Sequence, residues 1–123
     1  MTKIRVIKQP EYCSANYYSD DCSVRATAEA SLVGEKWWVN RVVVDPPTER
    51  GKGLGGRLLE ALKGAVRGAG GRTIFVSPGG YNGNVRAQKR FYRKHGFQPV
   101  RGSKGALLKI EFPFDVVVRA GEV

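Results

Sequence analysis

One short stretch says most about how this chain folds: Arg50-Gly51-Lys52-Gly53-Leu54-Gly55, which directly precedes apolar residues at helical spacing. Because glycine lacks a Cβ, consecutive backbone N–H groups in such a stretch approach an anion closely at the positive N-terminal end of a helix. The cations Arg50 and Lys52 add positive charge beside the glycines. The stretch therefore predicts a cradle for a pyrophosphate group at the start of a helix.

A second stretch, further along the chain, is rich in aromatic residues and cations. It reads Asn84-Val85-Arg86-Ala87-Gln88-Lys89-Arg90-Phe91-Tyr92-Arg93-Lys94-His95-Gly96-Phe97. Apolar and aromatic residues recur there at spacings of three and four, which predicts a helix from Val85 to His95 that stops at Gly96. Tyr92 and His95 lie on one face of this helix, and we expect His95 to be structural. Each stretch is a weak signal alone, but their order and separation make a strong one.

The remaining pattern predicts an α/β domain with a mixed sheet. A one-sided apolar pattern predicts a helix from Gly53 to about Ala69, and Pro46-Pro47 ends the strand before it. Apolar alternation and short apolar runs predict strands at 4–6, 24–32, 37–44, 73–76, 97–100 and 106–112. Less regular segments are read as a loop or short helix at 10–23, a loop at 78–83 and a tail at 115–123.

Length and composition limit the class of protein. With 123 residues and 41% apolar content, we expect a single domain over residues 1–123. No apolar run approaches the roughly 20 residues of a membrane span, and the first residues lead into alternating charge, so we expect a cytoplasmic protein with no membrane association. Cys13 and Cys22 lack metal-ligand spacing, and with a single histidine no metal site is predicted.

The positive charge is concentrated in one half of the chain. The net charge is +10, and no Asp or Glu occurs from Ala61 to Ile110. That window contains the cations Lys63, Arg67, Arg72, Arg86, Lys89, Arg90, Arg93, Lys94, Arg101, Lys104 and Lys109. A long segment with charges of only one sign indicates an anionic partner. A phosphate-rich cofactor, an acidic protein surface and nucleic acid remain open as that partner. A merely solvated basic face is the remaining alternative.

Other glycine-rich phosphate sites fit the first stretch less well. Residues 51–56 satisfy the GxGxxG pattern of dinucleotide sites, but a diprolyl turn separates them from the strand. The acidic residue expected about 20 positions later is also missing. A P-loop would need GK[ST], which is absent. Tight helix packing would explain Gly55 and Gly56 but not the neighbouring cations.

Taken together, the two stretches resemble the GCN5-related N-acetyltransferases (GNAT). The family's acetyl-CoA signature, [R/Q]xxGx[G/A] after a strand and a proline-containing turn, is matched by Arg50, Gly53 and Gly55. A second family stretch is matched by Asn84, Ala87, Phe91, Tyr92, Gly96 and Phe97. The resemblance covers roughly Trp37 to Ile110. It implies a GNAT-like mixed β-sheet flanked by helices, with a shortened N-terminal region.

The resemblance also implies an activity and its residues. It implies an acetyl-CoA-dependent N-acetyltransferase that acts on a primary amine by direct transfer in a ternary complex. The backbone of Arg50, Gly51, Lys52, Gly53, Leu54 and Gly55 would hold the pyrophosphate, and the strand end at Val42, Val43 and Val44 would pair with the pantetheine arm. Asn84 would contact that arm, and Tyr92 would protonate the departing thiolate. Aminolysis of a thioester needs such a proton donor, and a phenol with a pKa of about 10 is suited to the task.

The acceptor side is less defined by the sequence. Many relatives have two helices before the central strand, whereas this chain has only a short segment there, so we expect a small, open site suited to a protein or peptide amine. Strict alternation would place Trp38, Asn40 and Val42 on one face of that strand and Trp37, Val39, Arg41 and Val43 on the other, with no carboxylate. The general base therefore stays open between a water chain, Glu29 and solvent. A basic module that binds nucleic acid or an acidic protein, with little or no catalysis, is the alternative function.

Overall fold

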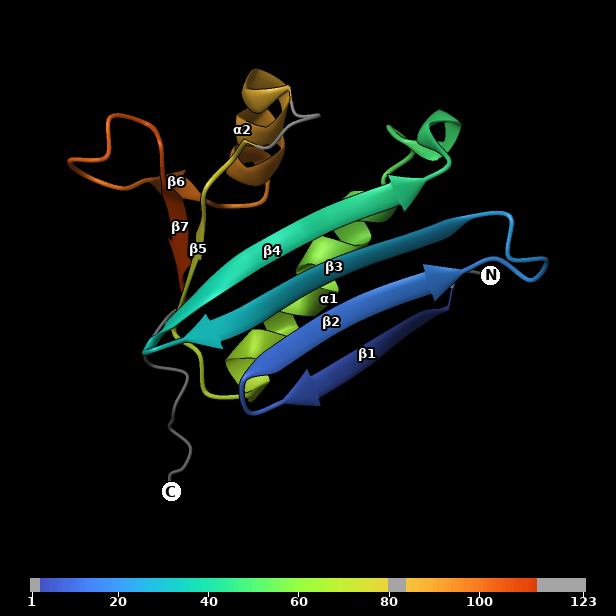
Figure 1. The fold of residues 1–123 in the computed structure, drawn as a ribbon, viewed down its shortest axis with the longest axis horizontal. Coiled ribbons are helices and arrows are strands. Elements are labelled where there is room, and N and C mark those ends of the chain that lie inside the picture. The colour runs from blue at the N-terminus through green and yellow to red at the C-terminus, as the bar shows by residue number, and fades with distance from the viewer. Residues whose placement is uncertain (1–2, 80–83, 113–123) are drawn as a thin grey trace.

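The computed structural model describes residues 3–79 and 84–112, which form a mixed sheet with helices (Figure 1). Seven strands follow the order β1-β2-β3-β4-β5-β7-β6. They are β1 (Ile4–Gln9), β2 (Tyr12–Tyr18), β3 (Arg25–Val33), β4 (Lys36–Asp45), β5 (Thr73–Val76), β6 (Gln98–Pro99) and β7 (Leu108–Glu111). The helices are α1 (Leu54–Gly68), α2 (Val85–Lys94) and the short 3₁₀ helix η1 (Pro47–Glu49). The predicted loop residues 80–83 and the predicted tail 115–123 lie outside the described residues.

Helix α1 packs across one face of the strands β1 to β4 and forms the core with them (Figure 1). Its buried side chains are Leu54, Leu58, Leu59, Leu62, Ala65 and Val66. The strands meet it with small residues, which are Cys13, Ala15, Ala26, Ala28 and Ala30. Small side chains on the sheet let the helix approach closely, and each fully buried leucine contributes about 1.5–3 kcal/mol. The predicted helix and the strand at 24–32 are confirmed.

The segment 10–23, read from sequence as loop or short helix, contains strand β2, so that reading was wrong. Strand β2 pairs antiparallel with β1 and with β3, for example through Val6↔Ala15 and Ala15↔Ala28. Two turn residues, Pro10 and Glu11, are all that separates β1 from β2. The element order therefore has one more strand than predicted. The other predicted elements are present, with the last two strands shorter than expected.

Strand β4 contains a β-bulge at Asn40. Pairing with β3 shifts from Glu29↔Arg41 to Ala30↔Val39, so Asn40 has no residue opposite it. An extra residue on one strand reverses the alternation of side chains beyond it. Before the bulge Val39 is buried, whereas Asn40 and Arg41 are both exposed.

The prediction of strict alternation along this strand was therefore wrong. Val42 and Val44 lie on the α1 side, because their methyl carbons come within 3.6 and 3.7 Å of the position that a Cβ would take at Gly55 in α1. They share this side with the buried Trp37 and Val39. Arg41 and Val43 face the opposite side. The bulge thus decides which side chains of the strand end approach α1.

Beyond Trp38, strands β4 and β5 diverge (Figure 1). Their parallel pairing is limited to Trp37↔Ile74 and Trp38↔Phe75. The outer edge of β4 from Val39 onward therefore has no strand partner within the described residues. Helix α2 follows β5 in the chain and lies beside the diverging strands in this view.

Helix α2 is attached both to the loop after β5 and to α1. The Gln88 side chain donates to the Gly79 carbonyl at 3.1 Å and accepts from the Gly79 N–H at 2.9 Å. Near its other end, the ring of His95 lies 2.8 Å from the position of a Cβ at Gly56, so only glycine fits there without a shift. Within the described residues, no helix is long and apolar enough to span a membrane.

Candidate active site

The glycine-rich stretch forms an open turn in front of α1. Gly51 and Gly53 have φ values of 84° and 88°, in the left-handed region that glycine adopts at little cost. A Cβ at either position would meet no atom within 4 Å, so the backbone here is approachable from outside. The predicted cradle is therefore present as a shape: an accessible glycine backbone leading into a helix.

The first turn of α1 keeps its positive end uncompensated. Gly53 is the N-cap residue and supplies no side-chain hydrogen bond, and the first turn contains no acidic residue. The first helical bond runs from the Arg57 N–H to the Gly53 carbonyl at 3.1 Å. The N–H groups of Leu54, Gly55 and Gly56 before it have no intrahelical acceptor. This end of α1 can bind an anionic group through backbone N–H groups and the helix dipole.

The two cations of the cradle have partners within the chain. The Arg50 Nε donates to the Val44 carbonyl at 3.3 Å, which links the cradle to the end of β4. The Lys52 ammonium lies 3.3 Å from both carboxylate oxygens of Glu49. Sequence reasoning did not anticipate either contact. Both cations remain exposed at the mouth of the cradle.

The end of β4 comes close to the start of α1. Of the three valines expected to pair with a ligand, Val44 is buried at 8% exposure, and Val42 and Val43 are half-buried. Besides the two valines on the α1 side, the Phe91 ring of α2 lies 3.8 Å from the position of a Cβ at Gly55. The structure therefore brings the strand end, the cradle and α2 together at one place.

Tyr92 is buried at 6% exposure within an aromatic cluster. Its ring is edge-on to Phe91 and Phe97, with centroid distances of 5.2 and 5.4 Å. Within the described residues its hydroxyl has no hydrogen-bond partner, which is uncommon for a buried polar group. Burial raises the pKa of Tyr92 to about 12, so the phenol keeps its proton at neutral pH. The group can act as a proton donor.

Asn84 caps the start of α2. Its Oδ1 accepts a hydrogen bond from the Ala87 N–H at 3.0 Å, the usual task of an N-cap asparagine. The amide nitrogen of the exposed side chain stays available for another acceptor. The sequence carries a signal for this cap that was not used above, because an Asn directly before the first residue of a helical pattern is a typical N-cap.

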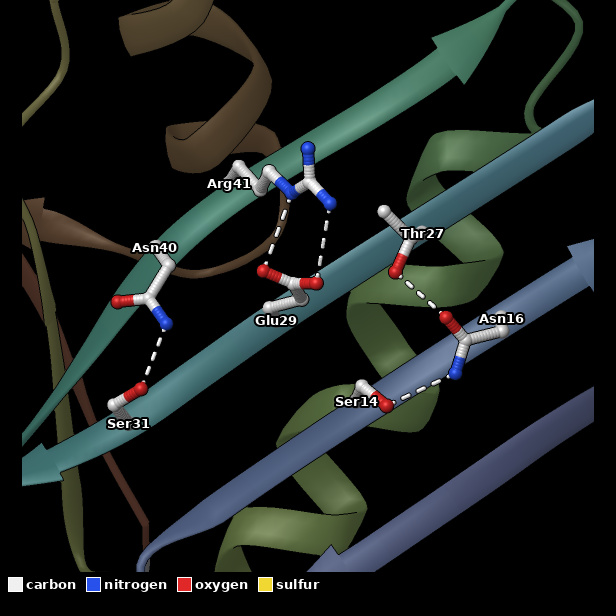
Figure 2. A network of polar contacts seen from close by, with 7 residues as sticks. All are labelled: Ser14, Asn16, Thr27, Glu29, Ser31, Asn40 and Arg41. Atoms are coloured by element: carbon white, nitrogen blue, oxygen red, sulfur yellow. Dashed lines mark hydrogen bonds and ion pairs between the residues drawn. The ribbon is translucent and has the colours of Figure 1, made fainter.

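The face of the sheet opposite α1 carries a network of polar side chains (Figure 2). Both oxygens of the Glu29 carboxylate accept from Arg41, at 3.2 and 3.3 Å. The Asn40 amide donates to Ser31 at 2.7 Å, so the bulged residue joins the network. In the described part of the chain, no helix covers this face, which agrees with the expected shortening of the N-terminal region.

A cluster of charged groups joins α1 to the end of α2. The Glu60 carboxylate lies 2.8 Å from the His95 Nδ1 and 2.9 Å from the Lys63 ammonium, which also donates to the His95 carbonyl at 2.8 Å. Burial raises the pKa of Glu60, but hydrogen bonds from Lys63 and His95 outweigh it and hold the pKa below its ordinary value. His95, which we expected to be structural, thus contacts the Glu60 carboxylate of α1. The sequence pattern had not indicated Glu60.

Comparisons with known proteins identify the family. The acetyltransferase (GNAT) domain matches residues 12–99. The fold is similar to that of a proposed acyl-CoA N-acyltransferase from Klebsiella pneumoniae, at 18% identity and a TM-score of 0.73, covering 92% of this chain and 99% of that one. It is also similar to the PaiA N-acetyltransferase of Thermoplasma acidophilum in complex with coenzyme A, at 16% identity and a TM-score of 0.64, covering 83% and 62% of the two chains.

A third similar structure is the ribosomal-protein-S18-alanine N-acetyltransferase of Escherichia coli, at 19% identity and a TM-score of 0.62, covering 85% of this chain and 72% of that one. No curated protein matches the sequence. The chain belongs to the GNAT acetyltransferase family, because the family matches most of its length. It is an N-acetyltransferase that uses acetyl-CoA as cosubstrate. The residues present fit this molecule. The cradle offers open space and N–H groups without intrahelical acceptors to a pyrophosphate, and Tyr92 offers a buried hydroxyl without a partner among the described residues.

Proposed function

We propose that this chain transfers the acetyl group directly to a primary amine of a protein or peptide within a ternary complex, with Tyr92 as general acid. The observation that carries the proposal is the buried Tyr92 hydroxyl, which has no partner among the described residues and lies on the helix beside the diverging strands. Bound acetyl-CoA supplies an activated thioester whose transfer leaves a thiolate. The Tyr92 Oη, protonated at neutral pH, donates its proton to that thiolate.

The cosubstrate is held by backbone groups in this proposal. The N–H groups at Arg50, Gly51, Lys52, Gly53, Leu54 and Gly55 bind the pyrophosphate, supported by the open glycine backbone and the uncompensated end of α1. The outer edge at Val42, Val43 and Val44, which has no strand partner among the described residues, binds the pantetheine arm through backbone hydrogen bonds. The Asn84 amide nitrogen donates to the same arm, because only its oxygen is used as a cap.

The acceptor reaches the site over the polar face of the sheet. This face is open because β1 and β2 are joined by a two-residue turn instead of helices, and an open face admits a polypeptide more readily than it encloses a metabolite. Both Glu29 oxygens already accept hydrogen bonds from Arg41. In this proposal the proton of the amine therefore passes to solvent.

The test combines an acceptor screen with a tyrosine variant. Protein, peptide and small-molecule amines are incubated with labelled acetyl-CoA, and intact mass identifies the acetylated acceptor. With that acceptor, Tyr92→Phe should keep acetyl-CoA affinity and lower the single-turnover rate by about 10²-fold, the usual scale for a positioned general acid. Tyr18→Phe, which alters an exposed tyrosine, should leave the rate unchanged.

Two results would contradict the proposal. A wild-type rate in Tyr92→Phe would show that the thiolate takes its proton from water and that the hydroxyl is incidental. Acetylation confined to small-molecule amines would refute the polypeptide acceptor while leaving the role of Tyr92 intact. The two claims are thus tested separately.

A further inference from the structure

The face of α2 opposite its packed side carries a row of cations. Lys89 and Arg90 lie three and four residues after Arg86, and Arg93 lies four and three residues after them, so the four cations lie on one face of the helix. The three arginines are exposed and Lys89 is half-buried. Residues that pack against the rest of the chain, Gln88, Phe91, Tyr92 and His95, occupy the other face.

The loop between β6 and β7 extends this row. The Lys89 Nζ lies 3.5 Å from the position of a Cβ at Gly105, so the loop lies against the helix. Arg101 and Lys104 of this loop are exposed, and Figure 1 shows the loop projecting beside α2. We call the six residues Arg86, Lys89, Arg90, Arg93, Arg101 and Lys104 the α2 basic surface.

The charges of this surface are not balanced within the described chain. None of the six cations forms an ion pair there, whereas Arg25, Arg41, Lys52 and Lys63 elsewhere each have a carboxylate partner. Like charges four residues apart on a helix repel each other, as Arg86 and Arg90 do. Arg86 in the first turn also opposes the helix dipole, which favours acidic residues there. An anion bound to these cations would offset both unfavourable effects.

The surface lacks what a protein partner or a single strand would need. Protein interfaces have an apolar or aromatic centre, and single-stranded nucleic acid stacks its bases on exposed aromatic rings. Val85, at 40% exposure, is the one large exposed hydrophobic residue of α2 and the described loop. A duplex backbone, by contrast, presents only phosphates to arginine and lysine.

We propose that the α2 basic surface binds the phosphate backbone of double-stranded nucleic acid, without reading its sequence. The surface is separate from the cradle, because Gly55 and Gly56 of α1 approach Phe91 and His95 on the opposite side of α2. In this proposal the chain therefore binds nucleic acid and acetyl-CoA at the same time, at two separate sites. This inference stands whether or not the proposed acceptor class is correct.

The test measures fluorescence anisotropy of labelled DNA and RNA duplexes with the full chain across salt concentrations. The surface variant replaces Arg86, Arg90 and Arg93 by Gln, and the control replaces Lys3, Arg5 and Lys8, exposed cations of β1 and the residue before it, by Gln. Both variants lose the same charge. At about 50 mM salt, the surface variant should bind at least about tenfold more weakly, with a salt slope lower by about 1 per lost phosphate contact. The control should change less than about threefold.

Circular dichroism and calorimetry with acetyl-CoA accompany these titrations, and both variants should remain folded with unchanged acetyl-CoA affinity. Equal weakening in the two variants would overturn the proposal, because it would show a diffuse charge effect. Parallel loss of acetyl-CoA affinity in the surface variant would assign the cations to the cosubstrate and also overturn it. Tighter binding of poly-glutamate than of either duplex would replace nucleic acid by an acidic protein. A preference between DNA and RNA would specify the partner and support the proposal.

Discussion

At the start of α2 a side chain of the protein caps the helix, whereas at the start of α1 none does. The Asn84 side chain accepts from the Ala87 N–H, while Gly53 offers α1 no side chain and the first turn no carboxylate. Both helices face the same energetic problem, which is a set of N–H groups without intrahelical acceptors. The difference teaches that one helix start has a side-chain cap from the protein, whereas the other keeps its first N–H groups available to a ligand.

The largest expected effect comes from obstructing the uncapped start. Gly53→Val places a branched side chain in open space before the N–H groups, at a φ of 88° that disfavours it. We expect acetyl-CoA affinity to fall at least about 100-fold, equivalent to about 2.7 kcal/mol, as measured by calorimetry. Gly34→Val is the matched control, since Gly34 has a φ of 65° and open space but lies in the turn between β3 and β4. Equal losses in both variants would show that strain alone, and not the cradle, is responsible.

Removing the Asn84 cap of α2 should have a smaller effect, and two variants of Asn84 separate its capping role from its proposed role in acetyl-CoA binding. Asn84→Ala removes the cap and should lower the free energy of unfolding by about 1 kcal/mol, measured by urea denaturation. Asn84→Asp keeps the accepting oxygen but loses the amide nitrogen, so it should keep stability and weaken acetyl-CoA binding. Undiminished affinity in Asn84→Asp would restrict Asn84 to capping.

The smallest effect concerns the link between α1 and the end of α2. Because the pKa of Glu60 lies below its ordinary 4.5 in the folded state, its stabilising contribution is complete at neutral pH and is lost as the pH falls through the folded value. Half-exposed ion pairs contribute little, so Glu60→Gln should cost less than about 1 kcal/mol. Melting temperatures of wild type and variant should converge below pH 4.5. Glu111→Gln, which alters an exposed pair with Lys109, should show no such difference at pH 7.

Much of this comparison could be predicted from the sequence. The glycine pattern located the start of α1, and helical spacing located α2, because one-sided apolar periodicity survives in both. Strand β2 escaped prediction since Cys13, Ser14 and Ala15 replace the branched residues that usually mark a strand. Cys13 and Ala15 are small because they pack in the core beneath α1, a tertiary effect with no local signal.

For the candidate site, the sequence motifs indicated residues but not all of their contacts. The motif indicated Tyr92, whose role stays a prediction. Its burial, without a hydrogen-bond partner among the described residues, depends on how Phe91 and Phe97 pack around it. The pairing of Glu60 with His95 joins residues that are far apart in the chain. Spacing arguments work within one helix and do not extend across two.

The bulge in β4 also decides which residues of the strand end lie on which face of the sheet. Because Asn40 is an extra residue, the alternation of side chains after it is shifted by one position, so Val42 and Val44 face α1 while Arg41 faces the opposite side. Deleting Asn40 alone would remove the bulge and leave these faces unchanged, because Val39 and Arg41 already pair with neighbouring residues of β3. Beyond the bulge, adding or removing an odd number of residues inverts the strand end, whereas an even number preserves it. An engineer who alters β4 between Arg41 and the cradle should therefore add or remove residues in pairs.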